Sequence, residues 1–245
     1  MDLWLRILIL AVLSYALGNW SMARMIAWKS HGVDISTKGS GNPGTMNMIR
    51  NFGYKKGIAT LILDGIKGAV PALLGNLLLE YNYPAGVGFN PSLLGVYVGG
   101  LAVIVGHMFP IVFKFKGGKG VACAIGVFFV ADPLVMLAVF VIGFFIFFIF
   151  EYGFVASLSC ILIISVLQIV QIFTQYRIST FSSEPLTDFI RTSAVLIGVI
   201  FALIYAAHWK NFQRLFTGKE SKLSIRAAIK DHRAKKRAES GSDNI

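Results

Sequence analysis

The chain has 245 residues, of which 56% are hydrophobic and only 14% are charged, and its mean hydropathy is +0.69. This composition lies outside the range of soluble globular domains and is typical of a protein that crosses a membrane several times. The formal net charge is +11, but lipid-length apolar segments interrupt the basic residues, which excludes a basic nucleic-acid-binding domain. Cys123 and Cys160 both lie in apolar segments and indicate small buried residues, with neither a disulfide framework nor a metal site.

The first apolar segment runs from Leu3 to about Arg24, which is long enough for one membrane crossing. Trp4 and Trp20 stand near its ends, where interfacial aromatic residues are common. A cleaved signal peptide is the alternative, since residues 16–18 have the small-x-small pattern of a cleavage site. The segment lacks a basic start, however, and its removal would upset the distribution of charge. We therefore expect it to be a membrane-spanning helix with the N-terminus outside.

A polar, glycine-rich stretch follows from Met25 to Lys56. The glycines, proline and asparagine between Lys38 and Gly44 predict a turn-rich loop. From Thr45 onward the apolar residues fall near helical spacing and predict a short interfacial helix. Serine, asparagine and arginine side chains gathered beside glycines are typical of a loop that holds phosphate, and a plain connecting loop is the alternative.

The second apolar segment, Gly57 to Leu79, contains Asp64 and Lys67. Charges at membrane depth are costly, and an aspartate and a lysine three residues apart can partly neutralise each other on one helix face. We expect a structural pair that faces the interior of a helix bundle. Direct contact between Lys67 and a substrate is the alternative.

The third apolar segment, Ser92 to Val112, follows an outside loop, Tyr81 to Pro91, that has no lysine or arginine. Within the segment, Gly95 and Gly99 have the GxxxG spacing at which two helices approach closely. We therefore expect this segment to pack tightly against another helix.

The stretch from Gly106 to Gly120 has three lysines and three glycines in its last seven residues and stands between two apolar segments. Glycines let backbone N–H groups approach a ligand, and the next helix begins here with unpaired amides. The pattern predicts an anion site, with phosphate as the natural ligand. A basic membrane anchor, the alternative, explains Lys114 and Lys116 but not the glycines. The stretch is not a nucleotide-binding P-loop, because Gly120 follows Lys119 where serine or threonine is required.

The apolar run from Val121 to Phe150 is too long for one ordinary crossing, and Asp132-Pro133 interrupts it. We predict a turn there, between a short helix, Val121 to Ala131, and a longer one, Leu134 to Phe150. Further crossings are predicted at Phe154 to Phe173 and at Phe189 to Ala207.

The last crossing leads into a third polar cluster. If the helix continues, His208, Asn211 and Arg214 lie on one side of it, and Gly218 is a suitable stop. Residues 1–220 then form one membrane domain, and residues 221–245 form a basic, flexible cytoplasmic tail.

Seven crossings would bring three polar clusters to the same side of the membrane: Ser40–Arg50, His107–Gly120 and His208–Gly218. Three basic stretches on that side hold 19 of the 23 lysines and arginines, so the positive-inside rule makes it the cytoplasmic side. The expected fold is all-α, a polytopic membrane bundle of about seven transmembrane helices. Its cytoplasmic face would carry a cationic site with few carboxylates, suited to two anionic groups at once.

Other chemistries lack their motifs. None of His31, His107 and His208 has the His-x4-Asp arrangement of acyl-CoA glycerolipid acyltransferases, and no histidine, cysteine or carboxylate spacing suits zinc. No paired aspartates are placed to hold magnesium. We expect no metal and no cofactor.

Three motifs carry a resemblance to a known family. The first is Gly39-Ser40-Gly41-Asn42-x-Gly44-x-x-Asn47-x-x-Arg50. The second is Gly106-His107-x-Phe109-Pro110 followed by Phe115-Lys116-Gly117-Gly118-Lys119-Gly120-Val121-Ala122. The third is His208-x-x-Asn211-x-x-Arg214-Leu215 with Gly218 and Glu220. With these motifs, the stretch from about Leu3 to Glu220 resembles the bacterial acyl-phosphate:glycerol-3-phosphate acyltransferases of the PlsY type.

The resemblance implies a seven-helix fold and transfer of a fatty acyl group from acyl phosphate to the 1-hydroxyl of glycerol 3-phosphate, with lysophosphatidic acid and phosphate as products. Such an enzyme belongs to phospholipid synthesis in the bacterial inner membrane. Its partners would be the two substrates and membrane lipid, without nucleic acid. The chain departs from the family where Thr45-Met46 replaces the usual Ala-Thr and where Cys123 replaces a threonine.

The catalytic candidates are the polar residues that the three motifs contribute: Ser40, Arg50, Lys119, His208 and Asn211. The substrate-binding candidates are the remaining polar and glycine positions around them, together with the intramembrane lysine: Gly41, Asn42, Gly44, Asn47, His107, Lys116, Gly117, Gly118, Gly120 and Lys67. The proton acceptor is either His208 or a phosphate oxygen of the substrate, and the resemblance favours the phosphate.

Two functions of other classes remain as alternatives. A transporter or channel for organic phosphates would use a similar cationic pocket, but it needs polar groups along a path through the membrane and often has inverted repeats. Here the polar residues gather at one face and no repeat is evident. A non-catalytic membrane subunit would leave the three clusters unexplained.

Overall fold

The computed structural model describes residues 2–79, 92–178 and 184–223. The predicted outside loop at Tyr81 to Pro91 and most of the predicted tail lie outside these residues. The described helices, in chain order, are α1 (Leu3–Gly18), α2 (Met22–His31), η1 (Ile35–Thr37), α3 (Thr45–Phe52), α4 (Tyr54–Leu78), α5 (Leu93–Met108), η2 (Ile111–Phe113), α6 (Val121–Ala131), α7 (Pro133–Phe150), α8 (Gly153–Ile178), α9 (Glu184–Ala207) and α10 (Trp209–Phe216).

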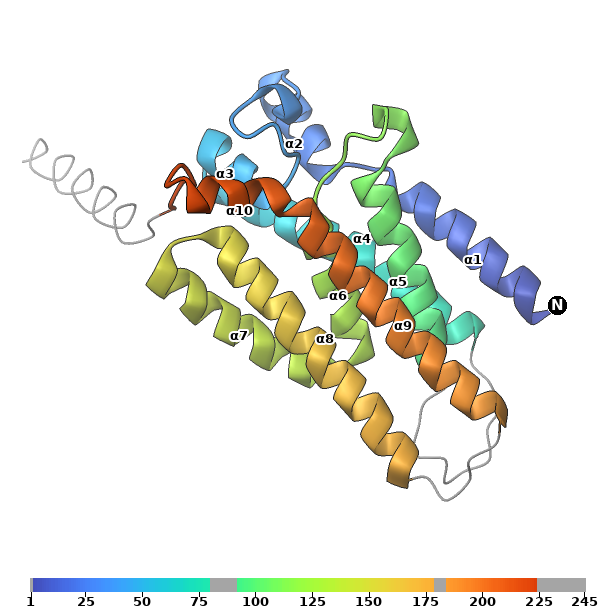
Figure 1. Ribbon diagram of the computed structural model, residues 1–245. Helices are drawn as coiled ribbons and strands as arrows, with labels where there is room; N and C mark the ends of the chain where they lie inside the picture. Colours follow the sequence, from blue (N-terminus) through green and yellow to red (C-terminus); the bar gives the residue numbers. More distant parts are fainter. Residues whose placement is uncertain (1, 80–91, 179–183, 224–245) are drawn as a thin grey trace, which may run out of the picture.

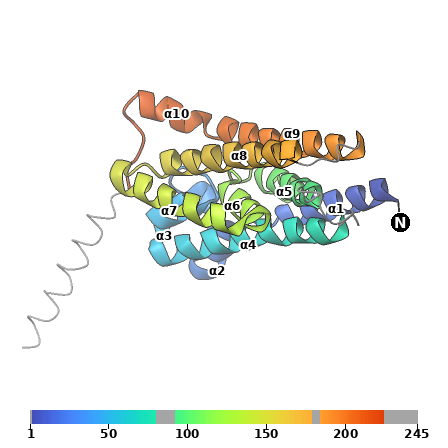
Figure 2. The same cartoon turned by 90° about the horizontal axis from the view of Figure 1, so that it is seen from below.

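The long helices run side by side as a bundle, and the short helices α2, α3 and α10 gather at one end of it (Figures 1 and 2). The N-terminus of α1 lies at the opposite end. No strand occurs within the described ranges, so the predicted all-α class is confirmed.

Six of the described helical segments are long and apolar enough to cross a membrane. The predicted turn at Asp132-Pro133 is confirmed, because the Asp132 carboxylate accepts the Val135 amide at 3.0 Å and caps α7. The seventh apolar helix, α6, has only 11 residues and is about 16 Å long at 1.5 Å per residue. It is therefore too short to cross alone, and Val127 and Phe128 are fully buried where it packs inside the bundle.

Helix α4 stands at the centre of this packing and contacts α1, α3, α5 and α6. A Cβ atom on Gly75 would lie 2.0 Å from the carbonyl oxygen of Gly95 on α5, and one on Gly68 would lie 2.0 Å from that of Cys123 on α6. Only glycine permits such close backbone contact. The tight packing predicted from the GxxxG pattern is therefore confirmed.

The predicted ion pair lies inside the bundle. Lys67 Nζ is 3.0 Å from Asp64 Oδ1, and the two side chains are 1% and 2% exposed. The structure therefore confirms the expectation of a buried intrahelical pair.

Several helix boundaries differ from the sequence prediction, and at two places one predicted helix is divided into two. The first helix ends at Gly18 and not near Arg24, and a separate helix, α2, occupies part of the stretch predicted as loop. The reason is local: the Ser21 hydroxyl accepts the Arg24 amide at 3.4 Å and so begins a new helix. The last helix is also divided, because α9 ends at Ala207 and α10 starts at Trp209.

Candidate active site

One cavity of about 570 Å³ joins the three polar clusters. Thirteen of the candidate residues line it: Ser40, Gly41, Asn42, Gly44, Asn47, Arg50, His107, Gly117, Gly118, Lys119, Gly120, His208 and Asn211. Lys67 and Lys116 are not among the lining residues. The clusters thus meet in space as the crossing count predicted, although they are far apart in sequence.

The first loop is shaped by Asn47, whose side chain is buried. Its Oδ1 accepts the Ser40 amide at 3.1 Å, and its Nδ2 donates to the carbonyl oxygens of Ile35 at 3.3 Å and Lys38 at 3.0 Å. Gly39 adopts φ +54°, and a Cβ there would lie 2.4 Å from Asn47 Oδ1. The Asn47 amide is therefore used to hold the loop, while Ser40 is left at the cavity wall.

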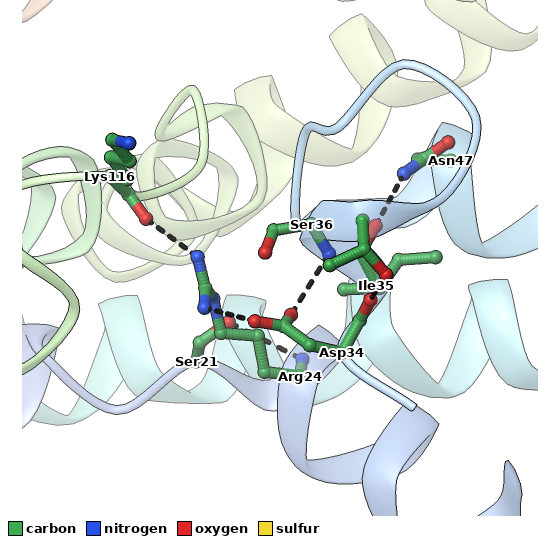
Figure 3. Close-up of polar contacts among 8 residues, drawn as sticks. Ser21, Arg24, Asp34, Ile35, Ser36, Asn47 and Lys116 are labelled. Carbon is green, nitrogen blue, oxygen red and sulfur yellow. Dashed lines mark hydrogen bonds and ion pairs between the residues drawn. The ribbon is translucent and has the colours of Figure 1, made fainter. Parts of the chain in front are cut away.

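Arg24, which the sequence motifs did not single out, ties the first loop to the second. Its guanidinium donates to Asp34 Oδ2 at 2.6 Å and to the Lys116 carbonyl oxygen at 3.0 Å. Figure 3 shows it between these two groups, with the Lys116 side chain directed away. Asp34 Oδ1 accepts the Ser36 amide at 2.9 Å, which fixes the start of the first loop. Lys116 thus contributes its carbonyl group to the architecture, and its side chain is exposed.

Two amides of the second loop are already used. Gly117 N–H donates to Met108 O at 3.2 Å, and Gly118 N–H donates to His107 O at 3.1 Å. The idea that the whole Gly117–Gly120 run offers its amides to an anion is therefore wrong for these two residues. The unpaired amides belong to the start of α6, where Gly120 adopts φ +81° and no side chain caps the helix.

The start of α3 at Gly44 also has no side-chain cap, and it lines the same cavity. Two helix N-termini with unpaired amides and partial positive charge therefore face one space. Such an arrangement is suited to bind phosphate groups.

The third cluster is organised by Glu220, a carboxylate that belongs to the third motif but was not among the candidate site residues. Its Oε1 accepts from Asn211 Nδ2 at 2.8 Å, and its Oε2 accepts from Arg214 Nε at 2.7 Å. Because this fixes the amide of Asn211, the oxygen Oδ1 faces Lys119 and accepts from its ammonium group. The predicted scarcity of carboxylates thus needs a correction: Glu220 and Asp64 both line the cavity, and each is paired with a cation.

Burial controls the charge of Lys119. Loss of hydration, followed by repulsion from Arg214, lowers the pKa of its ammonium group to about 8, against a smaller attraction from Glu220. Burial likewise lowers the pKa of Arg50, whose Nη2 donates to the Ser221 carbonyl oxygen at 2.8 Å. An anion that enters the cavity would stabilise the charged forms of both groups, because it replaces the lost hydration.

His208 lies at the junction of α9 and α10 and is 3% exposed. Its Nδ1–H donates to the Ile204 carbonyl oxygen at 2.7 Å, so a neutral ring presents Nε2 as an acceptor. Burial, and then the positive charge of Lys119, lowers the pKa of His208 to about 4. The imidazole is therefore neutral at pH 7.

The cavity continues from the polar residues into an apolar lining. Its apolar side chains come from α4, α6, α7 and α8: Ile58, Leu61, Ile125, Phe140, Phe144, Phe147, Phe154 and Cys160. Such a lining is suited to a hydrocarbon chain. No sequence pattern indicates this lining. Phe140, Phe144 and Phe147 do have helical spacing, but α7 is apolar on every side, so the pattern does not reveal which face lines a cavity.

Asp64, His107 and Cys123 place potential metal-ligand atoms within 4.8 Å of one another. The Lys67 ammonium group stands among them, 3.0 Å from Asp64 Oδ1 and 2.9 Å from His107 Nδ1. Because a metal ion would have to displace this cation, the donor set does not fit a resident metal.

The fold and the cavity define a polytopic α-helical membrane protein with a basic site and an apolar lining at one end of the bundle. The family model described as glycerol-3-phosphate acyltransferase matches residues 8–218. A glycerol-3-phosphate acyltransferase of Dechloromonas aromatica is 33% identical over 220 residues, which cover 89% of this chain and 97% of that protein. This chain belongs to the glycerol-3-phosphate acyltransferase family of the PlsY type.

Solved structures agree with this assignment. The crystal structure of PlsY, an integral membrane glycerol 3-phosphate acyltransferase, in its glycerol 3-phosphate form has a TM-score of 0.73 and 31% identity, covering 91% of this chain and 98% of that one. The lysophosphatidic acid form of PlsY has a TM-score of 0.70 and 32% identity, covering 89% of this chain and 95% of that one.

Proposed function

We propose that this protein transfers a fatty acyl group from acyl phosphate to the 1-hydroxyl of glycerol 3-phosphate and releases lysophosphatidic acid and phosphate. The observation that carries the proposal is a single cavity in which two uncapped helix starts, Arg50 and Lys119 meet an apolar lining. The family membership, and the glycerol 3-phosphate and lysophosphatidic acid forms of PlsY, support the acceptor and the product.

Acyl phosphate is a mixed anhydride with a good leaving group, so no covalent acyl-enzyme is required. The acceptor oxygen attacks the acyl carbon, the bond from that carbon to the phosphate oxygen breaks, and inorganic phosphate leaves. The protein then has to hold two phosphorylated molecules together, and positioning alone supplies on the order of 7–11 kcal/mol of barrier reduction.

The cations of the cavity divide between the two substrates in this proposal. Arg50, with Ser40 near the start of α3, binds glycerol 3-phosphate. Lys119 and the free amides at the start of α6 bind the acyl phosphate and the developing oxyanion. Asn211 holds Lys119 in place between them.

His208 orients the acceptor hydroxyl in this scheme and does not act as the base. Its Nε2 is an acceptor, but a group with a pKa of about 4 binds a proton weakly at pH 7. A phosphate oxygen of the substrate takes the proton. This choice follows from the low pKa of His208 and agrees with the family resemblance.

We place the protein in the bacterial inner membrane with its N-terminus outside and its active site at the cytoplasmic face. The basic residues support this orientation, since 19 of the 23 lie in three stretches predicted on one side.

The test is product analysis with purified protein in detergent, glycerol 3-phosphate and one defined acyl donor. Acyl phosphate should give lysophosphatidic acid and one equivalent of phosphate, and acyl-CoA should give neither. Turnover with acyl-CoA alone would refute the proposed donor. Counter-flow of labelled glycerol 3-phosphate into vesicles, without any acyl product, would instead indicate a transporter.

A further inference from the structure

The buried Lys67 has more partners than an ion pair requires. Its Nζ lies 2.6 Å from the Trp20 carbonyl oxygen, 2.9 Å from His107 Nδ1 and 3.0 Å from Asp64 Oδ1. An ammonium group has three N–H donors and no lone pair. Nζ donates to the carbonyl oxygens of Trp20 and, at 3.4 Å, Gly18, and its third donor meets His107 Nδ1, while Asp64 is its ion-pair partner. His107 Nδ1 must therefore accept, and the ring must carry its proton on Nε2.

That Nε2–H points toward the second loop. A Cβ atom on Gly118 would lie only 2.2 Å from His107 Nε2, so the nitrogen occupies the space that a side chain would fill. His107 is 6% exposed and lines the cavity, and among the described residues Nε2 has no hydrogen-bond partner. A nearly buried donor thus lies at the cavity wall beside Gly118, in the loop that leads to α6.

We propose that His107 donates its Nε2–H to a phosphate or carbonyl oxygen of the bound acyl phosphate, and that Lys67 is the positioning residue that fixes this tautomer. The inference deepens the proposed function and rests on it. It assigns Lys67 a role that acts through His107, without contact between Lys67 and the substrate.

Replacing Lys67 by methionine should change the pH dependence of the reaction. Among the described groups, Asp64 is then the charged neighbour of the ring, 3.7 Å from His107 Nδ1, and Cys123 lies beside it. Lys119, which follows Gly118, donates to Asn211 instead. A neutral ring would place its proton on Nδ1, toward the Asp64 carboxylate. Nε2 would then present a lone pair, and not a proton, to the acyl phosphate. Nε2–H would survive only in the imidazolium form.

The kinetic experiment compares kcat/KM of Lys67→Met and wild type at pH 5.5 and 7.5. The variant should lose roughly 10-fold to 100-fold at pH 7.5, the size of one hydrogen bond to a charged group, and its loss relative to wild type should be smaller at pH 5.5. Lys55→Met, an exposed lysine on the same helix, is the matched control and should not change either value. An equal loss at both pH values would mean a merely structural role and would overturn the proposal.

A second experiment tests Lys67→Met in a protein whose residue 107 cannot form tautomers. Glutamine in place of His107 keeps an N–H donor near the Nε2 position and has no tautomers. In His107→Gln, the further change Lys67→Met should produce no additional pH-dependent loss. A loss as steep as in the wild-type background would contradict the mechanism.

A spectroscopic measurement needs neither turnover nor a folded Lys67 variant. In protein labelled with ¹⁵N-histidine, the His107 signals are those absent from His107→Gln. They should show a protonated Nε2 and an unprotonated Nδ1, and Nε2–H should shift on titration with inorganic phosphate. A proton on Nδ1, or no response, would refute the inference, whereas failure of acyl transfer with the expected spectrum would refute only the proposed reaction.

Discussion

Lys119 and His208 show how burial sets the chemistry of single residues. Both side chains lose hydration in the cavity, and both have a pKa below the ordinary value. For Lys119 the shift brings the loss of charge close to physiological pH. For His208 it keeps the imidazole neutral and ready to accept a hydrogen bond.

The first prediction concerns Lys119. Its ammonium group is charged below a pKa of about 8, so kcat/KM for acyl phosphate should fall as the pH rises from 7 to 9. Lys119→Arg should keep some activity and lose this fall, because arginine stays charged throughout. The check is a pH profile of initial rates for both proteins. If kcat/KM of Lys119→Arg falls with rising pH as it does in wild type, a group other than Lys119 titrates.

The second prediction concerns Arg50 and His208. Arg50→Ala should lower kcat/KM by about 100-fold or more, since it removes the cation that we assign to the phosphate of glycerol 3-phosphate. His208→Gln should cost only about tenfold, because the glutamine oxygen can still accept from the hydroxyl. His31→Gln, which changes a histidine outside the cavity lining, is the control. A loss of several thousand-fold in His208→Gln would identify a general base.

At the scale of helices, glycine decides how closely the elements approach. Gly75 and Gly95 bring the backbones of α4 and α5 together, and Gly68 brings α4 onto α6. Since α6 begins at the proposed anion site and α5 ends at Met108 before the same loop, this packing also positions that loop.

The third prediction tests that packing. Gly75→Ala should lower the thermal unfolding midpoint in detergent, because its Cβ would lie 2.0 Å from the Gly95 carbonyl oxygen and the overpacking costs about 1–3 kcal/mol. Gly198→Ala on α9, where nothing lies within 4 Å of the added Cβ, should leave the midpoint unchanged or raise it. Equal effects of the two variants would argue against a tight α4–α5 contact.

The whole molecule has a polar end and an apolar remainder. The short helices α2, α3 and α10 lie together at one end of the bundle, and the N-terminus of α1 lies at the other (Figure 1). In the orientation that we propose, the polar end faces the cytoplasm.

The fourth prediction is the sidedness of the membrane protein. Single cysteines at the exposed positions Lys38, Lys114 and Lys219 should react with an impermeant maleimide only in inside-out vesicles. A single cysteine at the exposed position Asp2 should react only in intact cells. The native Cys123 and Cys160 are buried and serve as the unlabelled background. Labelling of Lys38→Cys and Lys219→Cys from opposite sides would contradict the shared cytoplasmic face.

The sequence by itself determined the all-helical class, the break at Asp132-Pro133 and the meeting of three clusters at one end. These follow from hydropathy, turn residues and the parity of the crossings, which are properties of single segments along the chain. It also indicated the Asp64–Lys67 pair, because the two residues are three apart on one helix.

Only the tertiary structure decided which polar groups are free to bind a ligand. The amides of Gly117 and Gly118 were expected in the anion site, yet they donate to the carbonyl groups of the preceding helix end. Arg24 and Glu220 organise the site through partners that packing brings close, and the apolar lining draws one face from each of four helices. A hydrogen bond depends on distances between segments, and local sequence patterns do not specify those distances.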